Sequence, residues 1–363
     1  MTTHRHSGLD VLRGLVIVLM TLDHARGFIA PAGMSPENLD TTTLPFFMSR
    51  WVTHLCAPTF VFLMGVGVGL RRQRKPHDMS GYLLSRGLWI VFLEVTWITF
   101  AFYWSLSRTF LGVLWALGGS MVLLAAMTRL SGRVLLWAGL LMTLTLDLLG
   151  LKGTDISAIG FLFAPHSFQI AGHWVHAAYA LVPWLAVAMI GVGVGPALSQ
   201  AKPRQIAKAG ACTLGIFVVL RSLQLGDPRA WSSHPRGTMF TTMDFINPSK
   251  YPPSMAFLAL TLGAAMLILA GMMGRRGALS NWLAMLGRVP LFFYLLHLPL
   301  CHGLGNLWAW SMHGVGRVPA QTPLSMPVIL GAWGLAILIL WPACAAWRRL
   351  KDQRPDLRWL AYL

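Results

Sequence analysis

Charged side chains are scarce in this chain of 363 residues, since Asp, Glu, Lys and Arg make up 11% of it and hydrophobic residues 55%. Soluble globular domains contain about 25% charged residues. The scarcity argues against a soluble fold, and repeated apolar runs of about twenty residues predict membrane-spanning helices instead. The connections between the runs are too short for an independent core, so we expect a single transmembrane domain over residues 1–363.

Cysteine is also rare, and its arrangement excludes two roles. The four cysteines lie in separate apolar runs and form no CxxC pair (Cys56, Cys212, Cys301 and Cys344). Neither a disulfide framework nor a cysteine metal site is therefore expected. The GxSxG, P-loop and HExxH motifs are absent as well, and the dispersed histidines predict no metal site.

Acidic residues are few, with 12 Asp and Glu against 29 Lys and Arg and a formal net charge of +17. Such an excess can indicate a nucleic-acid partner, but most of the basic residues fall on one side of the predicted spans. The positive-inside rule explains this distribution and predicts cytoplasmic N- and C-termini, with no nucleic-acid partner. The basic inner rim suits anionic membrane lipids or a phosphorylated cytosolic ligand.

The apolar runs predict an all-α polytopic bundle of about ten transmembrane helices. They cover residues 10–30, 46–70, 82–104, 109–128, 133–150, 174–198, 206–225, 254–273, 281–303 and 325–346. The longest connections, 151–173 and 226–253, fall on the outer side, where they either form a lid or acceptor site or simply join spans. The run Gly65-Val-Gly67-Val-Gly69 ends a helix, and a similar run occurs within 189–204. Both predict close helix packing and not a dinucleotide site.

The first apolar run carries the ionisable residues Asp10, Arg13, Asp23 and His24. Arg13 and His24 are eleven residues apart, so on a helix they share one face and lie about 16 Å apart along its axis. Asp10, one turn before Arg13, is expected to pair with it, and Asp23 adds a second carboxylate. Ionisable groups are costly in a membrane helix and mark functional sites by default. A snorkelling Arg13 and a hydrogen-bonded interior His24 are the structural alternative.

The second apolar run brings a further histidine to a similar depth. Arg50, His54 and Pro58 are spaced four residues apart, and Pro58 cannot donate a hydrogen bond to the carbonyl of His54. A kink beside a titratable ring is therefore expected, in the outer half of the bilayer, where His24 and His54 would meet. A kink with a purely structural histidine is the alternative.

The ninth run and the segment before the eighth add more polar groups. Arg288 lies near the inner end of the ninth run, with Tyr294 and His297 one turn apart in its outer half. Pro290 and Pro299 are expected to break the helix on either side of them. Lys250, in the outer segment MDFINPSKYPPS, either contacts a substrate or belongs to a rigid helix entry. A buried histidine as general base, with basic groups at the cytosolic entrance, is the chemistry that these residues favour.

Four stretches resemble one family of membrane enzymes: LDVLRGLVIVLMTLDH, HLCAPTFVFLMGVGVGL, FINPSKYPPS and LGRVPLFFYLLHLPL. They are similar to heparan-alpha-glucosaminide N-acetyltransferase, and Arg13-x10-His24 also resembles the first-helix motif of the acyltransferase-3 family. The resemblance implies a bacterial relative in the inner membrane, an acyl-CoA donor from the cytosol, and an amino sugar or glycan acceptor on the outer face. It places Arg13 toward the donor and His24 at the reaction centre.

One departure from the family bears on the mechanism. The lysosomal enzyme has a catalytic histidine just after the first span, but the segment APAGMSPENLDTTTLP contains none. Either His24 or His54 is therefore expected to take that role, or the chemistry differs from that of the lysosomal enzyme.

The hypothesis is acyl transfer from acetyl-CoA, with His24 as the base that deprotonates the acceptor amine or hydroxyl. The predicted catalytic residues are His24, His54 and Asp23. His54 would orient the base, act as a second base or carry the acyl group. The predicted groups for the coenzyme phosphates are Arg13, Arg288, Arg71 and Arg72. The predicted acceptor contacts are Arg50, His297, Tyr294 and Lys250.

Two other classes of function remain open from the sequence. One is a transporter or flippase for a small polar or sugar-linked substrate, in which the same groups line its path. The other is a non-catalytic membrane module. The sequence also leaves open whether the protein forms a homo-oligomer.

Overall fold

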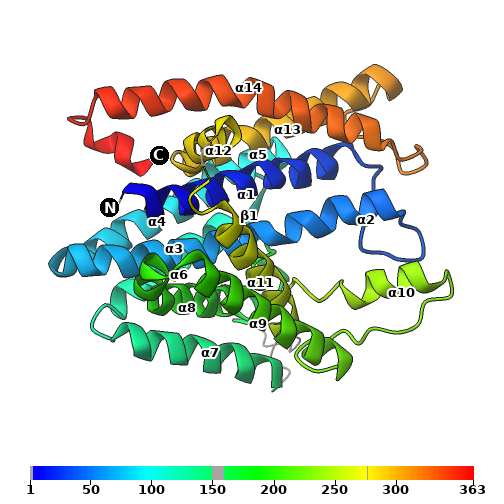
Figure 1. Cartoon of the computed structure of the whole chain (residues 1–363). Coiled ribbons are helices and arrows are strands. Elements are labelled where there is room, and N and C mark those ends of the chain that lie inside the picture. The colour runs from blue at the N-terminus through cyan, green and yellow to red at the C-terminus, as the bar shows by residue number, and fades with distance from the viewer. Residues whose placement is uncertain (1–2, 149–158, 276) are drawn as a thin grey trace. The chain divides into compact units, whose positions relative to one another are not determined.

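The computed structural model describes residues 3–148, 159–275 and 277–363 (Figure 1). The described residues are mostly helical and include a three-stranded sheet. The chain divides into two compact units. Unit 1 comprises Met1–Cys56, His234–Asp244 and Gly274–Leu363, and unit 2 comprises Ala57–Ser233 and Phe245–Met273.

Unit 1 is built around the first helix, which runs without a break. Its helices are α1 (Thr3–Ile29), α2 (Leu44–Trp51), α10 (Thr238–Phe245, except its last residue), α12 (Ala278–Gly287), α13 (Pro290–His313) and α14 (Met326–Gln353), with 3-10 turns at Val52–Leu55 and Arg358–Tyr362. Helix α1 packs against α12, α13 and α14. Leu22 of α1, Phe46 of α2 and Ile329 of α14 are among the buried residues of one core cluster.

Two glycines bring the backbones of α1 and α12 together. A Cβ atom on Gly14 would lie 1.9 Å from the carbonyl oxygen of Leu283, and one on Gly287 would lie 1.9 Å from that of Asp10. No side chain fits at either position, so this close approach fixes where α1 meets the end of α12.

Unit 2 contains the remaining helices and the sheet. Its helices are α3 (Cys56–Arg74, beginning at the boundary with unit 1), α4 (Met79–Leu93), α5 (Thr99–Tyr103), α6 (Val113–Ala126), α7 (Gly132–Leu148), α8 (Leu181–Gln200), α9 (Pro203–Ser222) and α11 (Met255–Met272). Short 3-10 turns occur at Pro76–Asp78 and Gly160–Leu162, and a π-helical turn at Glu94–Ile98 joins α4 to α5. Helix α4 packs on α6, α7 on α8, and α9 on α11.

The strands of unit 2 are β1 (Arg108–Leu111), β2 (His166–Ile170) and β3 (His173–Ala177), in the order β1-β3-β2. Strand β3 pairs in parallel with β1 and antiparallel with β2. One face of the sheet packs on a hydrophobic cluster formed by Leu111, Val175 and Ala177, with Phe168 against it.

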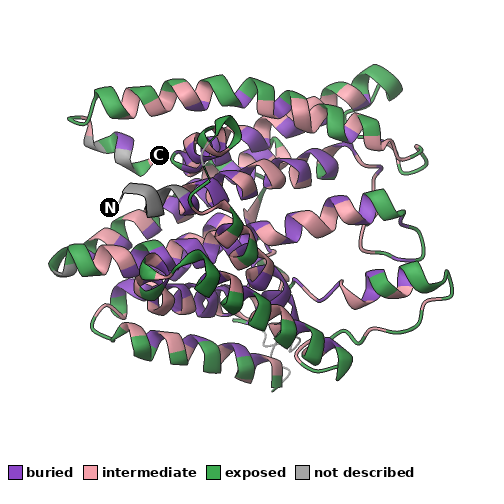
Figure 2. Ribbon diagram, viewed as in Figure 1, coloured by how far each residue is buried: buried purple, intermediate pink, exposed green. Residues whose placement is uncertain are grey.

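Exposed apolar residues line several helices, as expected for surfaces that face lipid. Figure 2 shows exposed residues along α7 and α14. Those on α7 include Val134, Trp137, Leu141, Leu144 and Leu148. A soluble protein rarely exposes such continuous apolar surface, so these faces support a membrane location.

The prediction of a mostly helical membrane protein is confirmed. Every one of the ten predicted ranges contains a helix. Within the described residues, five segments are long and apolar enough to cross a membrane (Leu44–Arg74, Met79–Tyr103, Leu181–Gln200, Met255–Met272 and Met326–Gln353). Helices α12 and α13, bent by 88° at their junction, make a sixth if they count as one span. The number ten and the cytoplasmic termini stay predictions.

The all-α expectation needs one correction, because the sheet occupies the predicted starts of the spans 109–128 and 174–198. Helix α6 begins only at Val113 and α8 only at Leu181. In β3 the buried Val175 and Ala177 alternate with the exposed Trp174 and His176, the two-residue period of a strand with one buried face. In the sequence this two-residue alternation is hard to recognise, because a much longer apolar run follows it directly.

Of the predicted helix breaks, those beside His54 and at Pro290 are present, and the one at Pro299 is not. The second run breaks at Val52–Leu55, before Pro58, because a proline is tolerated in the first turn of a helix. In the ninth run Pro290 begins α13, whereas Pro299 lies inside that helix.

The glycine-rich run at 65–69 packs closely, as predicted. A Cβ atom on Gly65 would lie 2.2 Å from the carbonyl oxygen of Ala188 on α8, and one on Gly191 would lie 2.3 Å from that of Phe62 on α3. The two similar glycine runs therefore pack against each other.

Replacing Gly65 with alanine is expected to lower the free energy of unfolding by about 1–3 kcal/mol, because the added methyl group would force α3 and α8 apart. Thermal unfolding of the detergent-solubilised protein measures this loss. Gly67→Ala is the matched control, since no atom lies within 4 Å of its Cβ position. Equal stability of the two variants would contradict the packing.

Candidate functional site

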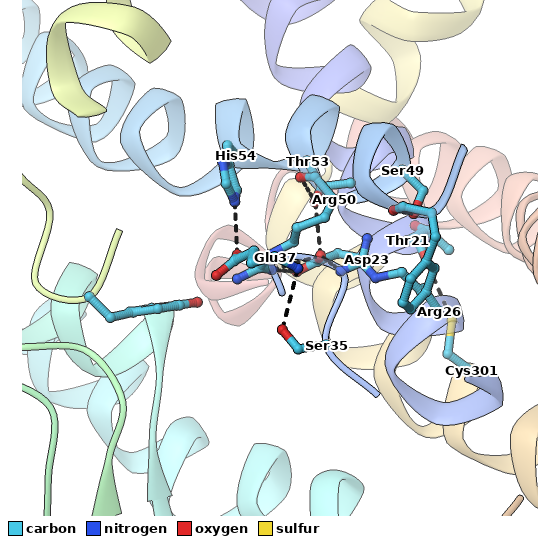
Figure 3. Close-up of polar contacts among 12 residues, drawn as sticks. Thr21, Asp23, Arg26, Ser35, Glu37, Ser49, Arg50, Thr53, His54 and Cys301 are labelled. Atoms are coloured by element: carbon cyan, nitrogen blue, oxygen red, sulfur yellow. Dashed lines mark hydrogen bonds and ion pairs between the residues drawn. The ribbon is translucent and has the colours of Figure 1, made fainter. Parts of the chain in front are cut away.

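Five ionisable side chains of unit 1 form a network that we call the polar cluster (Figure 3). Asp23 and Arg26 come from α1, Glu37 from the connection after it, Arg50 from α2 and His54 from the turn that follows α2. The break between α2 and α3 places His54 beside that connection. Three segments of the N-terminal region thus meet at one polar centre.

Asp23 is the centre of one half of the polar cluster. Its carboxylate accepts hydrogen bonds from Arg50 Nη1 at 2.9 and 3.0 Å and from the hydroxyl of Thr53 at 2.8 Å. It also forms an ion pair with Arg26, a buried residue that is only 5% exposed. Two guanidinium groups therefore share one carboxylate, an arrangement that holds both arginines in place.

Glu37 is the centre of the other half. Its Oε1 accepts a hydrogen bond from Arg50 Nε at 2.6 Å and lies 3.1 Å from His54 Nε2. Burial raises the pKa of the Glu37 carboxyl, but the hydrogen bond with His54 and the charge of Arg50 outweigh it and hold the pKa well below its usual range. Glu37 is thus a carboxylate, and the carboxylates of Asp23 and Glu37 face two guanidinium groups beside His54.

Sequence reasoning missed Glu37 as well as Arg26. The connection after α1 contains no histidine, but it contains a carboxylate, Glu37, just before the apolar run that carries Arg50 and His54. Arg26 is one turn after Asp23, the same spacing that predicted the pair of Asp10 and Arg13, so helical periodicity could have found it. Only the fold of the connection brings Glu37 to Arg50.

His24 lies against a second histidine. Its ring centroid is 5.0 Å from that of His297 on α13, in an edge-on arrangement. His297 Nδ1 is 2.7 Å from the carbonyl oxygen of Tyr294, and a carbonyl oxygen only accepts, so Nδ1 carries the proton. The neutral ring then presents Nε2 as an acceptor. This buried atom has no hydrogen-bond partner in the part of the chain that the structure describes.

The structure therefore gathers several of the predicted residues in unit 1. Asp23, Arg50 and His54 lie in the polar cluster, and His24 lies with Tyr294 and His297. His24 pairs with His297, and His54 pairs with Glu37. The predicted contact of His24 with His54 stays a prediction.

The predicted pair of Arg13 and Asp10 is present, with Nη1 2.9 Å from the carboxylate. Arg13 also reaches the carbonyl oxygen of Gly287 at 3.3 Å, and Arg288 Nε lies 3.4 Å from Asp10. Because α1 is unbroken, Arg13 and His24 are about 16 Å apart along it. Both face the α12–α13 segment, which agrees with their shared helix face.

The remaining predicted site residues belong to unit 2 and have local partners. Arg71 stacks over the ring of Tyr82 at 3.7 Å and lies 3.6 Å from Asp78. Arg72 donates to the carbonyl oxygen of Leu130. Lys250 is buried, with Nζ 4.9 Å from the centroid of the Tyr251 ring. Their roles toward donor and acceptor stay predictions.

The two long predicted connections contain strands and a helix. Residues 149–158 of the connection 151–173 lie outside the described residues, and the rest forms β2 and the start of β3. The connection 226–253 contains α10. Just before this helix, His234 lies 3.4 Å from Asp40, and Arg236 donates to the carbonyl oxygen of Thr42 at 3.0 Å.

No group of three or more metal-ligating side chains occurs among the residues that the structure describes. The cysteines are free thiols, of which Cys56, Cys301 and Cys344 are buried.

The family described as heparan-alpha-glucosaminide N-acetyltransferase, catalytic, matches residues 5–224. The chain belongs to this family. A search of curated proteins found no match. Membership in the heparan-alpha-glucosaminide N-acetyltransferase family indicates an acetyltransferase. The matched range contains the whole polar cluster together with Arg13 and His24, whereas Lys250, Arg288, Tyr294 and His297 lie beyond it.

Proposed function

We propose that this protein is a membrane N-acetyltransferase that moves an acetyl group from acetyl-CoA to an amino sugar or glycan acceptor. The proposal rests on the family match, and the polar cluster within the matched range contains a histidine and a carboxylate suited to general-base catalysis. In this proposal the protein spans a bacterial inner membrane ten times with both termini in the cytoplasm. The donor enters from the cytosol and the acceptor from the outer face.

His54 acts as the general base. Glu37 accepts the Nε2 proton of the neutral ring, so Nδ1 is the atom that takes a proton from the attacking amine or hydroxyl. The attack forms the new bond to the thioester carbonyl carbon and gives a tetrahedral intermediate. The C–S bond breaks when that intermediate collapses. The protonated ring then returns its proton to the departing coenzyme A sulfur. The His54–Glu37 contact supports this role, because a carboxylate orients the imidazole and stabilises the imidazolium.

His24 is the less suitable base of the two. Its ring partner is the buried His297, which offers no compensating charge when His24 is protonated. We assign His24, with His297 and Tyr294, to holding the acceptor beside the base. His297 Nε2 is suited to accept a hydrogen bond from a hydroxyl or amine.

Arg26 is placed to stabilise the transition state. Its Nη1 is buried and has no hydrogen-bond partner within the described ranges. A guanidinium N–H that is already held by Asp23 can donate to the oxygen on which negative charge develops in the tetrahedral intermediate. Arg50, between Asp23 and Glu37, keeps both carboxylates in position.

The arginines at the other end of α1 suit the phosphates of the donor substrate. Arg13 and Arg288 share the single carboxylate of Asp10, which leaves one positive charge in excess. The side chain of Arg288 is 45% exposed and therefore open to a ligand. Arg71 and Arg72 are the second predicted group for phosphates or for anionic lipid headgroups.

The test is thiol release by the purified protein in detergent, with acetyl-CoA as donor and glucosamine as acceptor. We expect acetyl-CoA to raise the unfolding temperature, and free thiol and N-acetylglucosamine to form in equal amounts. A protein that moves glucosamine across proteoliposomes without consuming acetyl-CoA would be a transporter instead. A protein that neither binds acetyl-CoA nor transports would be a non-catalytic module.

A further inference from the structure

Exposed apolar side chains follow one face of α4, the π-helical turn and α5, a segment long and apolar enough to cross a membrane. We call them the apolar stripe: Leu84, Leu88, Phe92, Trp97 and Trp104. The first three are spaced four residues apart and therefore share a helix face. Trp97 is five residues further on, and the π-helical turn keeps it on that face because its hydrogen bonds join residues five apart. Such a continuous apolar face suits the acyl chains of lipids.

The apolar stripe ends in a row of aromatic rings. Phe100 lies between Trp97 and Trp104, with its ring centroid 6.3 and 5.6 Å from theirs. Trp104 directly follows α5 and is 44% exposed. Exposed tryptophans at the end of a span are typical of the membrane–water interface, where the lipid headgroups lie. The end of α5 is therefore expected at the level of the headgroups.

A cavity of about 410 Å³ lies at this end of the apolar stripe, and its volume is within the range of small-molecule sites. Its lining comes from α5 and the three strands: Tyr103, Arg108, Ser167, Trp174, Val175 and His176. Tyr103 is the neighbour of Trp104 in the chain, and its ring packs on that of Phe110 in β1 at 6.4 Å. One segment of unit 2 thus carries both the apolar stripe and a wall of the cavity.

The strand register sets which side chains face the cavity. Arg108 pairs with Trp174, and Ser167 pairs with His176. Residues paired across neighbouring strands project to the same face of a sheet. The opposite face packs on the hydrophobic cluster of the sheet, so these four side chains are turned away from that core. The cavity is thus a preformed feature of the sheet.

The cavity offers one cation and two groups that bind hydroxyls. None of its lining residues is acidic, and the guanidinium of Arg108 lies 5.3 Å from the centroid of the Tyr103 ring. Burial lowers the pKa of His176, so its ring adds no second positive charge near pH 7. Ser167 Oγ and His176 Nδ1 are 2.6 Å apart, and both side chains can also hydrogen-bond to a ligand. This set fits an anion that carries hydroxyl groups.

We propose that the cavity binds the headgroup of an anionic phospholipid that carries hydroxyls, such as phosphatidylglycerol. The phosphate pairs with Arg108, the headgroup hydroxyls bond to Ser167 and His176, and the acyl chains lie along the apolar stripe. A zwitterionic lipid such as phosphatidylcholine brings a cation of its own, for which the cavity lining has no carboxylate. The binding does not depend on acetyl transfer.

Native mass spectrometry of the full-length protein, delipidated in detergent, measures the dissociation constant of each added lipid. The probes are phosphatidylglycerol and phosphatidylcholine with the same acyl chains. We expect phosphatidylglycerol to bind about fivefold to tenfold more tightly, because only its headgroup has a net negative charge to pair with Arg108. An excess of glycerophosphoglycerol, its deacylated headgroup, should not displace the lipid, because it lacks the chains that pack on the apolar stripe.

Variants assign the contributions of the charge and the ring. Arg108→Gln should remove the preference for phosphatidylglycerol, whereas Arg108→Lys should keep most of it. Trp174→Ala should weaken the binding of both lipids by about threefold to tenfold, because Trp174 is 52% exposed in the cavity and available to either. Arg133→Gln and Trp137→Ala, which change exposed residues of α7, are the matched controls and should bind like the parent.

Two results would overturn the inference: equal binding of the two lipids by the parent, or an unchanged preference in Arg108→Gln. Displacement of the lipid by glycerophosphoglycerol would overturn it as well, because the ligand would then be a phosphate ester in solution and not a lipid. None of these results bears on the acetyltransferase, which thiol release tests separately.

Discussion

Replacing His54 with glutamine is expected to lower the rate of acetyl transfer by about 10²- to 10⁴-fold, the usual contribution of a general base. The glutamine amide can still donate a hydrogen bond to Glu37, so the polar cluster should keep its shape. Unlike histidine, the glutamine side chain cannot take up the proton of the acceptor. Thiol release at saturating acetyl-CoA measures the effect on kcat, and the unfolding temperature with and without acetyl-CoA shows that folding and donor binding remain.

Two further variants distinguish the base from its neighbours. Glu37→Gln should lower kcat less than His54→Gln does, because it removes the charge that stabilises the imidazolium but leaves the base. His24→Gln should mainly raise KM for the acceptor. If instead His24→Gln loses the activity and His54→Gln keeps it, the base is His24 and the assignment to His54 is wrong.

Much of the first helix could be predicted from the sequence, because helical periodicity is enough to place residues on one face. Asp10 and Arg13 are one turn apart and pair, and Arg13 and His24 face the same neighbouring segment. The predicted depth of His297 agrees with its contact to His24. These relations depend only on distance along unbroken helices.

The partners across segments could not be predicted in the same way. Periodicity predicts which residues share a face of a helix, but not which neighbouring segment that face contacts. It therefore could not predict the contacts of His24 with His297 and of His54 with Glu37. Glu37 lies in an irregular connection that has no periodicity. The strand His173–Ala177 was hidden because five residues of alternating burial adjoin a much longer apolar run.

The largest effect on stability is expected for Asp23→Ala, which should lower the free energy of unfolding by about 3 kcal/mol or more. The side chains of Arg26 and Arg50 are 6% and 13% exposed. Removing the carboxylate between them takes away the ion pair that each of the two buried guanidinium groups makes with Asp23. An uncompensated buried charge typically costs about 3–5 kcal/mol.

Thermal unfolding in detergent measures this loss against a surface control. Asp352→Ala breaks the pair with Arg348, but the side chain of Asp352 is 57% exposed, so we expect about 1 kcal/mol or less. The double variant Asp23→Ala with Arg26→Ala should recover part of the stability, because it removes the charge that lost its partner. If Asp23→Ala lowers the free energy of unfolding no more than Asp352→Ala does, the stability of the polar cluster does not depend on its central carboxylate. A stable but inactive Asp23→Ala protein would then place Asp23 in the chemistry alone.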